Sequence, residues 1–295
     1  MRPSPQAMPC RTRAAVIILG APRFVPAAMV AAIVSVPSFA TAQSGPPAIA
    51  SREFSMVRPA LSGESALETV AYLDRFVRWP GNAGFDSSIV HVAARLAAAG
   101  YVEQSAAKPS DRLTYRVERY PMTGPAWEPI NAAVRFAARE ARQRIANQPP
   151  ILVFASNRNM LATNSFSTGE GGVTAEVVRI ASVTPAALDS AGVAGKIVMA
   201  DGRIGQLFTE AVVKRGAVGV MAYSMPAYTQ PEKNTRSIQF SGIPYDSAKK
   251  SWGILLSFDA RRQLLEAMRA GPVAIHVETS TRFVSPAMEL AIVAE

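Results

Sequence analysis

The order of apolar and polar positions between Gly195 and Tyr223 predicts one compact structural unit. Short apolar runs begin at Ile197 and Ala217, and each has the length expected of a buried strand. A glycine-bearing turn follows the first run, and Gly216 stops the chain before the second. Between the runs, apolar side chains recur at the spacing of one helix face, at Leu207, Phe208, Ala211 and Val212. The pattern predicts a strand, a helix and a second strand.

Two helices joined by a short loop are predicted ahead of this unit. Apolar residues recur at helical spacing over 65–77, and the sequence Trp-Pro-Gly-Asn at 79–82 ends that helix. Asp86 and Ser87 are expected to cap the second helix, which stops at Gly100.

The other elements are mostly strands. Alternating apolar and polar residues from Leu113 to Tyr120 predict a half-buried strand, and 121–129 are expected to form a loop. Residues 131–138 fit a strand, and their Ala and Arg content leaves a helix open. The remaining predictions are strands at 151–154, 173–180, 254–257, 273–278 and 288–293, a helical turn at 184–188 and a helix from about Asp259 to Gly271. Strands outnumber helices, so the predicted fold class is α+β, an open β-barrel module flanked by helices.

Composition indicates a packed globular protein. The 295 residues are 49% hydrophobic and 18% charged, which is ordinary for a domain with a core. The formal charge is +9, but four arginines and no acids lie in the first 42 residues, so the rest carries about +5 (9 less 4). Basic residues there do not cluster with aromatic ones, and we therefore expect no nucleic-acid partner.

The first 42 residues are typical of an export signal. A basic start precedes an apolar stretch over 24–36, and Ala40-Thr41-Ala42 suits cleavage after Ala42. An uncleaved anchor is the alternative, but a span needs about 20 apolar residues, and Pro22, Arg23 and Pro26 interrupt the longer run. We expect an exported, periplasmic or extracellular protein with no stable membrane span after cleavage. Cys10, the only cysteine, would leave with the signal, and 43–62 would form a flexible leader.

The strand-helix-strand unit resembles the protease-associated (PA) domain. Gly-Lys-Ile-Val at 195–198 opens the first strand, and Lys-Arg-Gly-Ala-Val-Gly-Val at 214–220 leads into the second. Gly202 and Gly205 would also suit a phosphate-binding turn, but no nucleotide-binding motif accompanies them. The resemblance implies a module that secreted peptidases carry as an insert or appendage.

A second resemblance concerns the segment ahead of the PA-like unit. Residues 73–101, with Arg-Trp-Pro-Gly-Asn at 78–82 and Ala-Ala-Gly-Tyr at 98–101, resemble the amino-terminal helices of the M28 family of zinc aminopeptidases. That family often has a PA domain inserted ahead of its metal site, and 288–295 resemble the strand that returns to the catalytic sheet. The implied fold is a PA-type open β-barrel or sandwich with flanking helices, preceded by a helical segment of a peptidase α/β domain. The implied divisions are signal 1–42, leader 43–62, amino-terminal segment 63–130, PA-like domain 131–281 and start of a catalytic domain 282–295.

The resemblance implies a metal site that this sequence does not supply. M28 chemistry needs two zinc ions held by two histidines and three carboxylates, with another carboxylate as general base. His91 lies off the apolar stripe of its helix and is expected to be solvated. His276 and Glu278 point the same way from a strand, but the glycine-rich Asp-bearing loop of the family does not follow them. We interpret the pair as the polar face of a strand.

No catalytic or metal-binding residue is therefore predicted. There is no Gly-x-Ser-x-Gly motif, and neither histidine has an evident acid partner for a nucleophile. We expect no cofactor in this chain, with zinc only in a full-length parent.

The loop after the second core strand is the candidate binding surface. Residues 224–234 combine an aromatic side chain, a thioether and rigid prolines, and loops on a rigid scaffold often carry binding residues. Its candidate contact residues for a peptide or a neighbouring catalytic domain are Met225, Tyr228, Gln230, Glu232 and Lys233. An ordinary long connection is the alternative.

Two functions remain open. The first is the non-catalytic amino-terminal and PA-domain part of an exported M28-like metallopeptidase, truncated before its metal-binding body, with peptide or protein substrates reached through the missing domain. The second is a stand-alone envelope module that binds a partner without enzymatic activity. An apolar strand at 288–293 would leave an unpaired edge in a finished module, which favours the first.

Overall fold

The computed structural model describes residues 48–137 and 149–295, in two compact units that divide after Leu61. In the described part of the first unit, α1 (Ala48–Val57) leads into the 3-10 turn η1 (Arg58–Ala60). Helix thus occupies much of the stretch for which the sequence predicted a flexible leader. The expected export signal and Cys10 lie outside the described residues.

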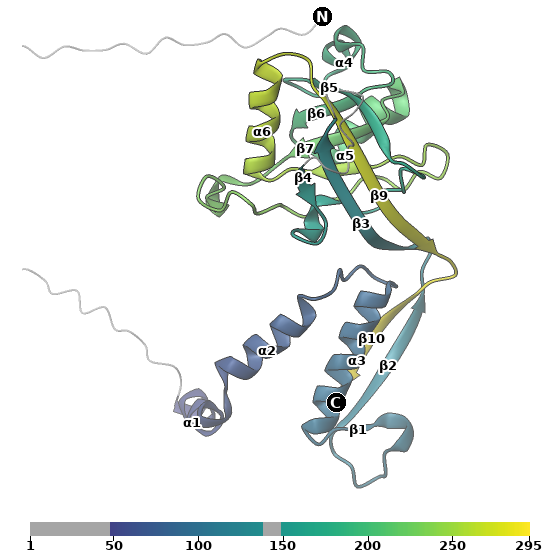
Figure 1. The fold of residues 1–295 in the computed structure, drawn as a ribbon. Helices are drawn as coiled ribbons and strands as arrows, with labels where there is room; N and C mark the ends of the chain where they lie inside the picture. The colour runs from purple at the N-terminus through teal and green to yellow at the C-terminus, as the bar shows by residue number, and fades with distance from the viewer. Residues whose placement is uncertain (1–47, 138–148) are drawn as a thin grey trace, which may run out of the picture. The chain divides into compact units, whose positions relative to one another are not determined.

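The second unit begins with two helices and a small sheet. Helices α2 (Gly63–Leu73) and α3 (Ala83–Ala98) precede the short strand β1 (Val102–Glu103) and the 3-10 turn η2 (Gln104–Ala106). Within the described residues the small sheet has the order β1-β2-β10, with β2 at Thr114–Pro121 and β10 at Met288–Ala294. Strands β2 and β10 pair antiparallel from Pro121 and Met288 to Tyr115 and Ala294, and α3 packs on both (Figure 1).

The second sheet contains seven strands in the described part of the chain, in the order β4-β3-β9-β5-β6-β7-β8. Strands β4, β3, β9 and β5 pair antiparallel, and β5, β6, β7 and β8 pair parallel. The bounds are β3 Ala126–Phe136, β4 Pro150–Val153, β5 Val173–Arg179, β6 Ile197–Asp201, β7 Gly219–Tyr223, β8 Gly253–Leu255 and β9 Ala274–Val284.

Helices accompany this sheet. They are α4 (Pro185–Ala191), α5 (Ile204–Leu207), which continues into the π-helical turn η5 (Phe208–Val213), and α6 (Phe258–Arg269). Two 3-10 turns, η4 (Arg158–Met160) and η6 (Ala227–Thr229), lie in the connections. The predicted strand, helix and strand between Gly195 and Tyr223 are confirmed as β6, α5 with η5, and β7.

One segment of chain borders two strands of the seven-stranded sheet, β8 and β9. Leu161 forms a bridge with Ile254 beside β8, and the backbone N–H of Ala162 donates to the Gly253 carbonyl at 3.0 Å. A few residues later, the N–H of Thr168 donates to the Thr279 carbonyl on β9 at 3.1 Å. A mixed α+β fold with a curled, open sheet agrees with the predicted fold class.

The core lies around the parallel strands. Ile197, Val198 and Val220 are fully buried, and Trp252 packs against the start of β7. A Cβ on Gly219 would lie 2.5 Å from ring atoms of Trp252, so the absence of a side chain there lets the indole approach the strand.

Several local predictions need correction. Asn82 caps α3, accepting from the Phe85 N–H at 2.8 Å, whereas the sequence indicated Asp86 and Ser87. Strand β3 begins at Ala126, inside the predicted loop 121–129, because pairing with β9 extends it. The stripe expected to be buried on the first helix is exposed at Leu67 and Val70, and that helix ends at Leu73. Helix α6 begins at Phe258, one residue before the predicted start, and Ser257 caps it.

Candidate functional site

Charged and aromatic side chains gather where the parallel strands β6 and β7 end. Arg261 of α6 donates to both carboxylate oxygens of Asp201, at 2.7 Å each, and lies over the Tyr223 ring at 5.0 Å. The Arg261 hydrogen bonds hold the pKa of Asp201 below its ordinary value, and burial raises the pKa of Tyr223. Both groups therefore keep their usual charge near neutral pH. The cluster fixes α6 to the strand ends from which the candidate loop departs.

The candidate loop is held by its own hydrogen bonds. Thr229 donates through its hydroxyl to the Pro226 carbonyl at 2.6 Å, and the Asn234 side chain donates to the Thr229 carbonyl at 2.8 Å. Gln230 adopts a left-handed conformation with φ of 48°, which turns the chain after η6. The loop is an ordered turn whose far end reaches α6, where the N–H of Asp259 donates to the Thr235 carbonyl at 3.0 Å.

The five predicted loop residues do not converge on one site. Tyr228 is 83% exposed and Met225 is half-buried. Gln230, Glu232 and Lys233 are exposed. None of them is among the residues that line the pocket beyond the end of the loop. Their role in binding stays a prediction.

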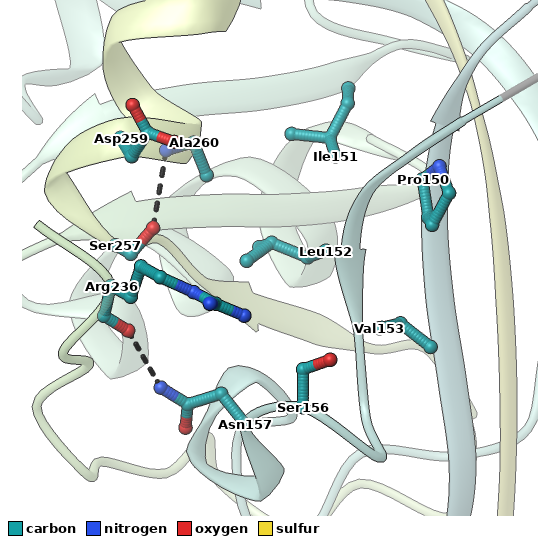
Figure 2. A pocket seen from close by; sticks show the side chains of 10 residues that line it. All are labelled: Pro150, Ile151, Leu152, Val153, Ser156, Asn157, Arg236, Ser257, Asp259 and Ala260. Carbon is teal, nitrogen blue, oxygen red and sulfur yellow. Dashed lines mark hydrogen bonds between the residues drawn. The ribbon is translucent and has the colours of Figure 1, made fainter.

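A pocket of about 230 Å³ lies between β4 and the first turn of α6 (Figure 2). Its walls come from β4, the residues just after it, Arg236 and the start of α6. Arg236 is positioned by the Asn157 side chain, which donates to its backbone carbonyl at 2.8 Å. Within the part of the chain that the structure describes, the Arg236 guanidinium makes no hydrogen bond or ion pair. A cation thus lines this pocket with its N–H donors unbonded, and the Asp259 carboxylate of the same pocket lies near enough to feel its charge.

An acid on the opposite wall of the pocket is already engaged. Asp259 accepts from Arg262 at 2.6 Å and from the Gln263 side chain at 3.2 Å. The Arg262 hydrogen bond first, then the Gln263 contact and the nearby charge of Arg236, hold the pKa of Asp259 below its ordinary value. The carboxylate is directed to its own helix, and Arg236 remains available to a ligand.

His276 is buried, which corrects its interpretation as part of a polar strand face. Its side chain is 7% exposed, and Nδ1 lies 2.8 Å from the Thr174 hydroxyl. Glu278 lies 3.5 Å from Nε2 and is bound on its other oxygen by Arg135 at 3.1 Å. Gly172 covers the ring so closely that a Cβ there would lie 2.8 Å from two ring atoms. The histidine is a packed residue under a glycine-rich turn.

His91 also differs from its prediction as a solvated histidine. Its ring stacks on Tyr72 at 3.8 Å between centroids, and Arg75 lies over the same tyrosine at 4.1 Å. The residue is half-buried between α2 and α3. Its contacts are those of helix packing.

The described residues do not fit a zinc site. Residues 48–137 and 149–295 contain no group of three or more His, Cys, Asp or Glu side chains that could hold a metal ion. The His276 and Glu278 pair has Thr174 and Arg135 as its other neighbours, and a guanidinium repels a cation. In the same part of the chain, no helix has the length and apolar character needed to cross a membrane.

Sequence reasoning missed Arg236 as a pocket residue. It stands two positions beyond the predicted loop, in a polar stretch where an arginine is unremarkable. The pocket forms because β4 and α6, about 100 residues apart in the chain, come together beside it. No local pattern marks such a position.

Comparison with known proteins gives weak matches to peptidases. No family model and no curated protein matches the sequence. Among solved structures, the chain is similar to a peptidase M28 precursor from Shewanella amazonensis, with 17% identity and a TM-score of 0.47, over 76% of this chain and 48% of that one.

Two aminopeptidases give similar values. An aminopeptidase from Aneurinibacillus sp. strain AM-1 is 14% identical with a TM-score of 0.40, over 79% of this chain and 46% of that one. A zinc aminopeptidase from Bacillus subtilis is 16% identical with a TM-score of 0.43, over 73% and 42%. The chain spans less than half the length of each of the three structures. With every TM-score below 0.5, these matches carry no assignment of family or function.

Proposed function

We propose that residues 62–295 are the amino-terminal segment and PA-type domain of an exported M28-like zinc metallopeptidase, and that they bind peptide without cutting it. Peptide hydrolysis would belong to the whole enzyme, with zinc held by residues other than those described. The PA-type domain would govern access of peptide or protein to the catalytic part.

The pairing of β2 with β10 is the observation that carries this proposal. The chain leaves the small sheet after Pro121, forms the whole seven-stranded sheet from Ala126 to Val284, and returns to pair with β2 from Met288. A domain that leaves and re-enters between two paired strands is an insert in the domain to which those strands belong. This topology supports a PA-type domain carried within a peptidase sheet.

The sequence motifs fall where that interpretation needs them. Gly-Lys-Ile-Val at 195–198 leads into β6, and the Gly216 to Val220 segment leads into β7, which lies beside β6 in parallel register. Residues 78–82 form the turn ahead of α3, where the Asn82 side chain also donates to the Trp127 carbonyl at 3.3 Å. The amino-terminal segment is thus bonded directly to the start of the inserted sheet.

The proposal is tested at the gene and then with protein. The locus should be translated in all frames on both sides of these codons, in search of a His-x-Asp with a glycine-rich Asp-bearing loop. The polypeptide so encoded is then produced with and without the inserted residues 126–284, and hydrolysis of leucine p-nitroanilide is measured. We expect turnover that depends on zinc and changes in KM when this part is removed. A locus without such ligands would contradict the proposal.

A stand-alone interaction module is the second candidate, favoured by the exposure of Tyr228. Tyr228 is 83% exposed on an ordered turn, and tyrosine is a residue type enriched at protein interfaces. Replacing Tyr228 and Met225 with Ala should then weaken capture of a partner from envelope extract without changing the melting temperature. Unchanged capture would indicate that the loop is an ordinary connection.

A further inference from the structure

The pocket beside β4 has two chemically different walls. Leu152 and Ile151 of β4, with Ala260 of α6, form an apolar wall. Arg236 enters from the other side, and Figure 2 shows its side chain extending across the pocket toward β4, below Leu152. A ligand that fills this space meets a cation and an aliphatic surface together.

The positive charge of Arg236 favours an anionic group of the ligand on the polar side of the pocket. The Arg236 guanidinium has no ion-pair partner among the described residues, while Asp259 is occupied by Arg262 and Gln263. A guanidinium offers two parallel N–H donors that match the two oxygens of a carboxylate. The best-matched anion is a carboxylate bound side-on to Arg236.

The apolar wall decides which carboxylate fits. An acidic side chain would bring its charge to Arg236 but nothing to cover Leu152 and Ile151. A chain end presents its carboxylate next to its own side chain, so an apolar last residue uses both walls at once. We propose that this pocket binds the carboxyl terminus of a peptide whose last residue is apolar, with Arg236 holding the carboxylate.

Binding at this pocket is expected to change little between pH 5 and 8. No histidine is among the described residues that line the pocket. A peptide carboxyl terminus titrates near 3.5, and an arginine guanidinium stays charged throughout this range. Because the contact is an ion pair at a partly open site, affinity should fall as salt is raised.

The inference does not depend on the peptidase proposal, because the test measures binding alone. Fluorescein-labelled hexapeptides ending in leucine are titrated with the full chain by fluorescence anisotropy, once with a free carboxyl terminus and once as the amide. We expect the free acid to bind at least about tenfold more tightly, since a charged hydrogen bond is worth roughly 1.5 kcal/mol or more.

The variants assign this difference to Arg236. In R236Q the preference for the free acid should disappear, and R236K should keep only part of it, because an ammonium does not bind side-on. R203Q is the matched control, since Arg203 is also an exposed loop arginine without an ion pair among the described residues, and it lies outside the pocket. Melting curves confirm that each variant is folded.

Three results would overturn the proposal. Equal binding of the acid and the amide would show that no terminal carboxylate is recognised. Equally tight binding of an amidated peptide with an internal glutamate would show that the pocket recognises an acidic side chain and not a chain end. Lack of saturation by the free acid up to about 1 mM would mean that the pocket is not a peptide site at all.

Discussion

Gly172 shows how a single residue determines the surroundings of the buried histidine. Its φ of 69° lies in the left-handed region, and a Cβ would meet two His276 ring atoms and the Val277 carbonyl at 2.8 Å. The neighbouring Gly171 has a similar φ of 79° but open space around it. Both positions have a positive φ that favours glycine. Only at Gly172 would a Cβ also clash with neighbouring atoms.

Substituting each glycine by alanine separates these two effects. We expect Gly171→Ala to cost about 1–2 kcal/mol of unfolding free energy from backbone strain alone. Gly172→Ala should cost about 2–5 kcal/mol, because overpacking adds about 1–3 kcal/mol. Urea denaturation at pH 7 measures both. Equal losses would show that the turn does not press on His276.

Asn82 serves two elements at once. Its Oδ1 accepts from the Phe85 N–H at the start of α3, and its Nδ2 donates to the Trp127 carbonyl at the start of β3. Asp86, which the sequence indicated as a cap, instead has one buried oxygen without a partner among the described residues. Burial raises the pKa of Asp86, so its ionised form near pH 7 opposes folding.

Alanine at the two positions should have unequal effects. Asn82→Ala removes a cap and the buried hydrogen bond to the Trp127 carbonyl, for a loss of about 2–3 kcal/mol. Asp86→Ala should lie within about 0.5 kcal/mol of wild type at pH 7. Thermal melts of both variants check this. A larger loss for Asp86→Ala would restore it as the cap.

Helix α6 is fixed to the sheet by long-range contacts. Arg261 joins it to Asp201 at the end of β6, and the N–H of Asp259 joins it to Thr235, the residue after the candidate loop. Ser257 caps its first turn by accepting from the Ala260 N–H at 3.1 Å. The position of α6, and with it the pocket of Arg236, depends on these contacts.

The Asp201 and Arg261 pair should stabilise the fold in a pH-dependent way. The folded pKa of Asp201 is lowered, so the stabilisation is present above the unfolded value near 3.9 and is lost as pH falls through the folded pKa. Because Asp201 is partly exposed, Asp201→Asn should cost only about 1 kcal/mol at pH 7. That difference from wild type should vanish by about pH 2.

Unfolding curves at pH 7 and at low pH measure the effect. Glu170→Gln is the matched control, because Glu170 is an exposed carboxylate without an ion pair among the described residues. It should change stability at neither pH. A loss for Asp201→Asn that persists in acid would mean that the carboxylate acts through its shape and not its charge.

Elements with strong local patterns could be predicted from sequence. The buried runs that became β6 and β7 and the helical stripe of α6 depend on near neighbours alone. Features set by distant contacts could not. Strand β3 extends over Pro129 because β9 pairs with it, and His276 is buried because a turn about 100 residues earlier covers it.

The candidate site shows the same limit. The loop after β7 could be recognised by its prolines and its aromatic residue, and the structure places it at the strand end as expected. Arg236 could not be recognised, because its importance comes from β4 and α6 meeting beside it. A residue that lines a pocket formed by distant segments cannot be identified from the local sequence around it.

At the scale of the whole molecule, the two sheets of residues 62–295 should differ in stability. Strands β6 and β7 lie at the centre of the core, whereas β2 lies between β10 and the short β1. Amide exchange should therefore be at least tenfold slower in β6 and β7 than in β2 and β10, as roughly expected for separate cooperative units.

One substitution sharpens this prediction. Leu290 is buried on β10, and Leu290→Ala should speed exchange in β2, β10 and α3 while leaving β6 and β7 unchanged. Hydrogen exchange followed by mass spectrometry reads all of these elements in one experiment. A uniform increase in exchange would contradict the description of the seven-stranded sheet as a separate insert.

We propose that residues 62–295 bind peptide and that catalytic zinc is held by residues outside them. The decisive test is the amount of zinc per chain, measured by inductively coupled plasma mass spectrometry on protein purified with zinc present and then dialysed. We predict zinc at the level of the dialysis buffer. One or two zinc ions per chain, with hydrolysis of leucine p-nitroanilide, would contradict the account and place a metal site within this protein.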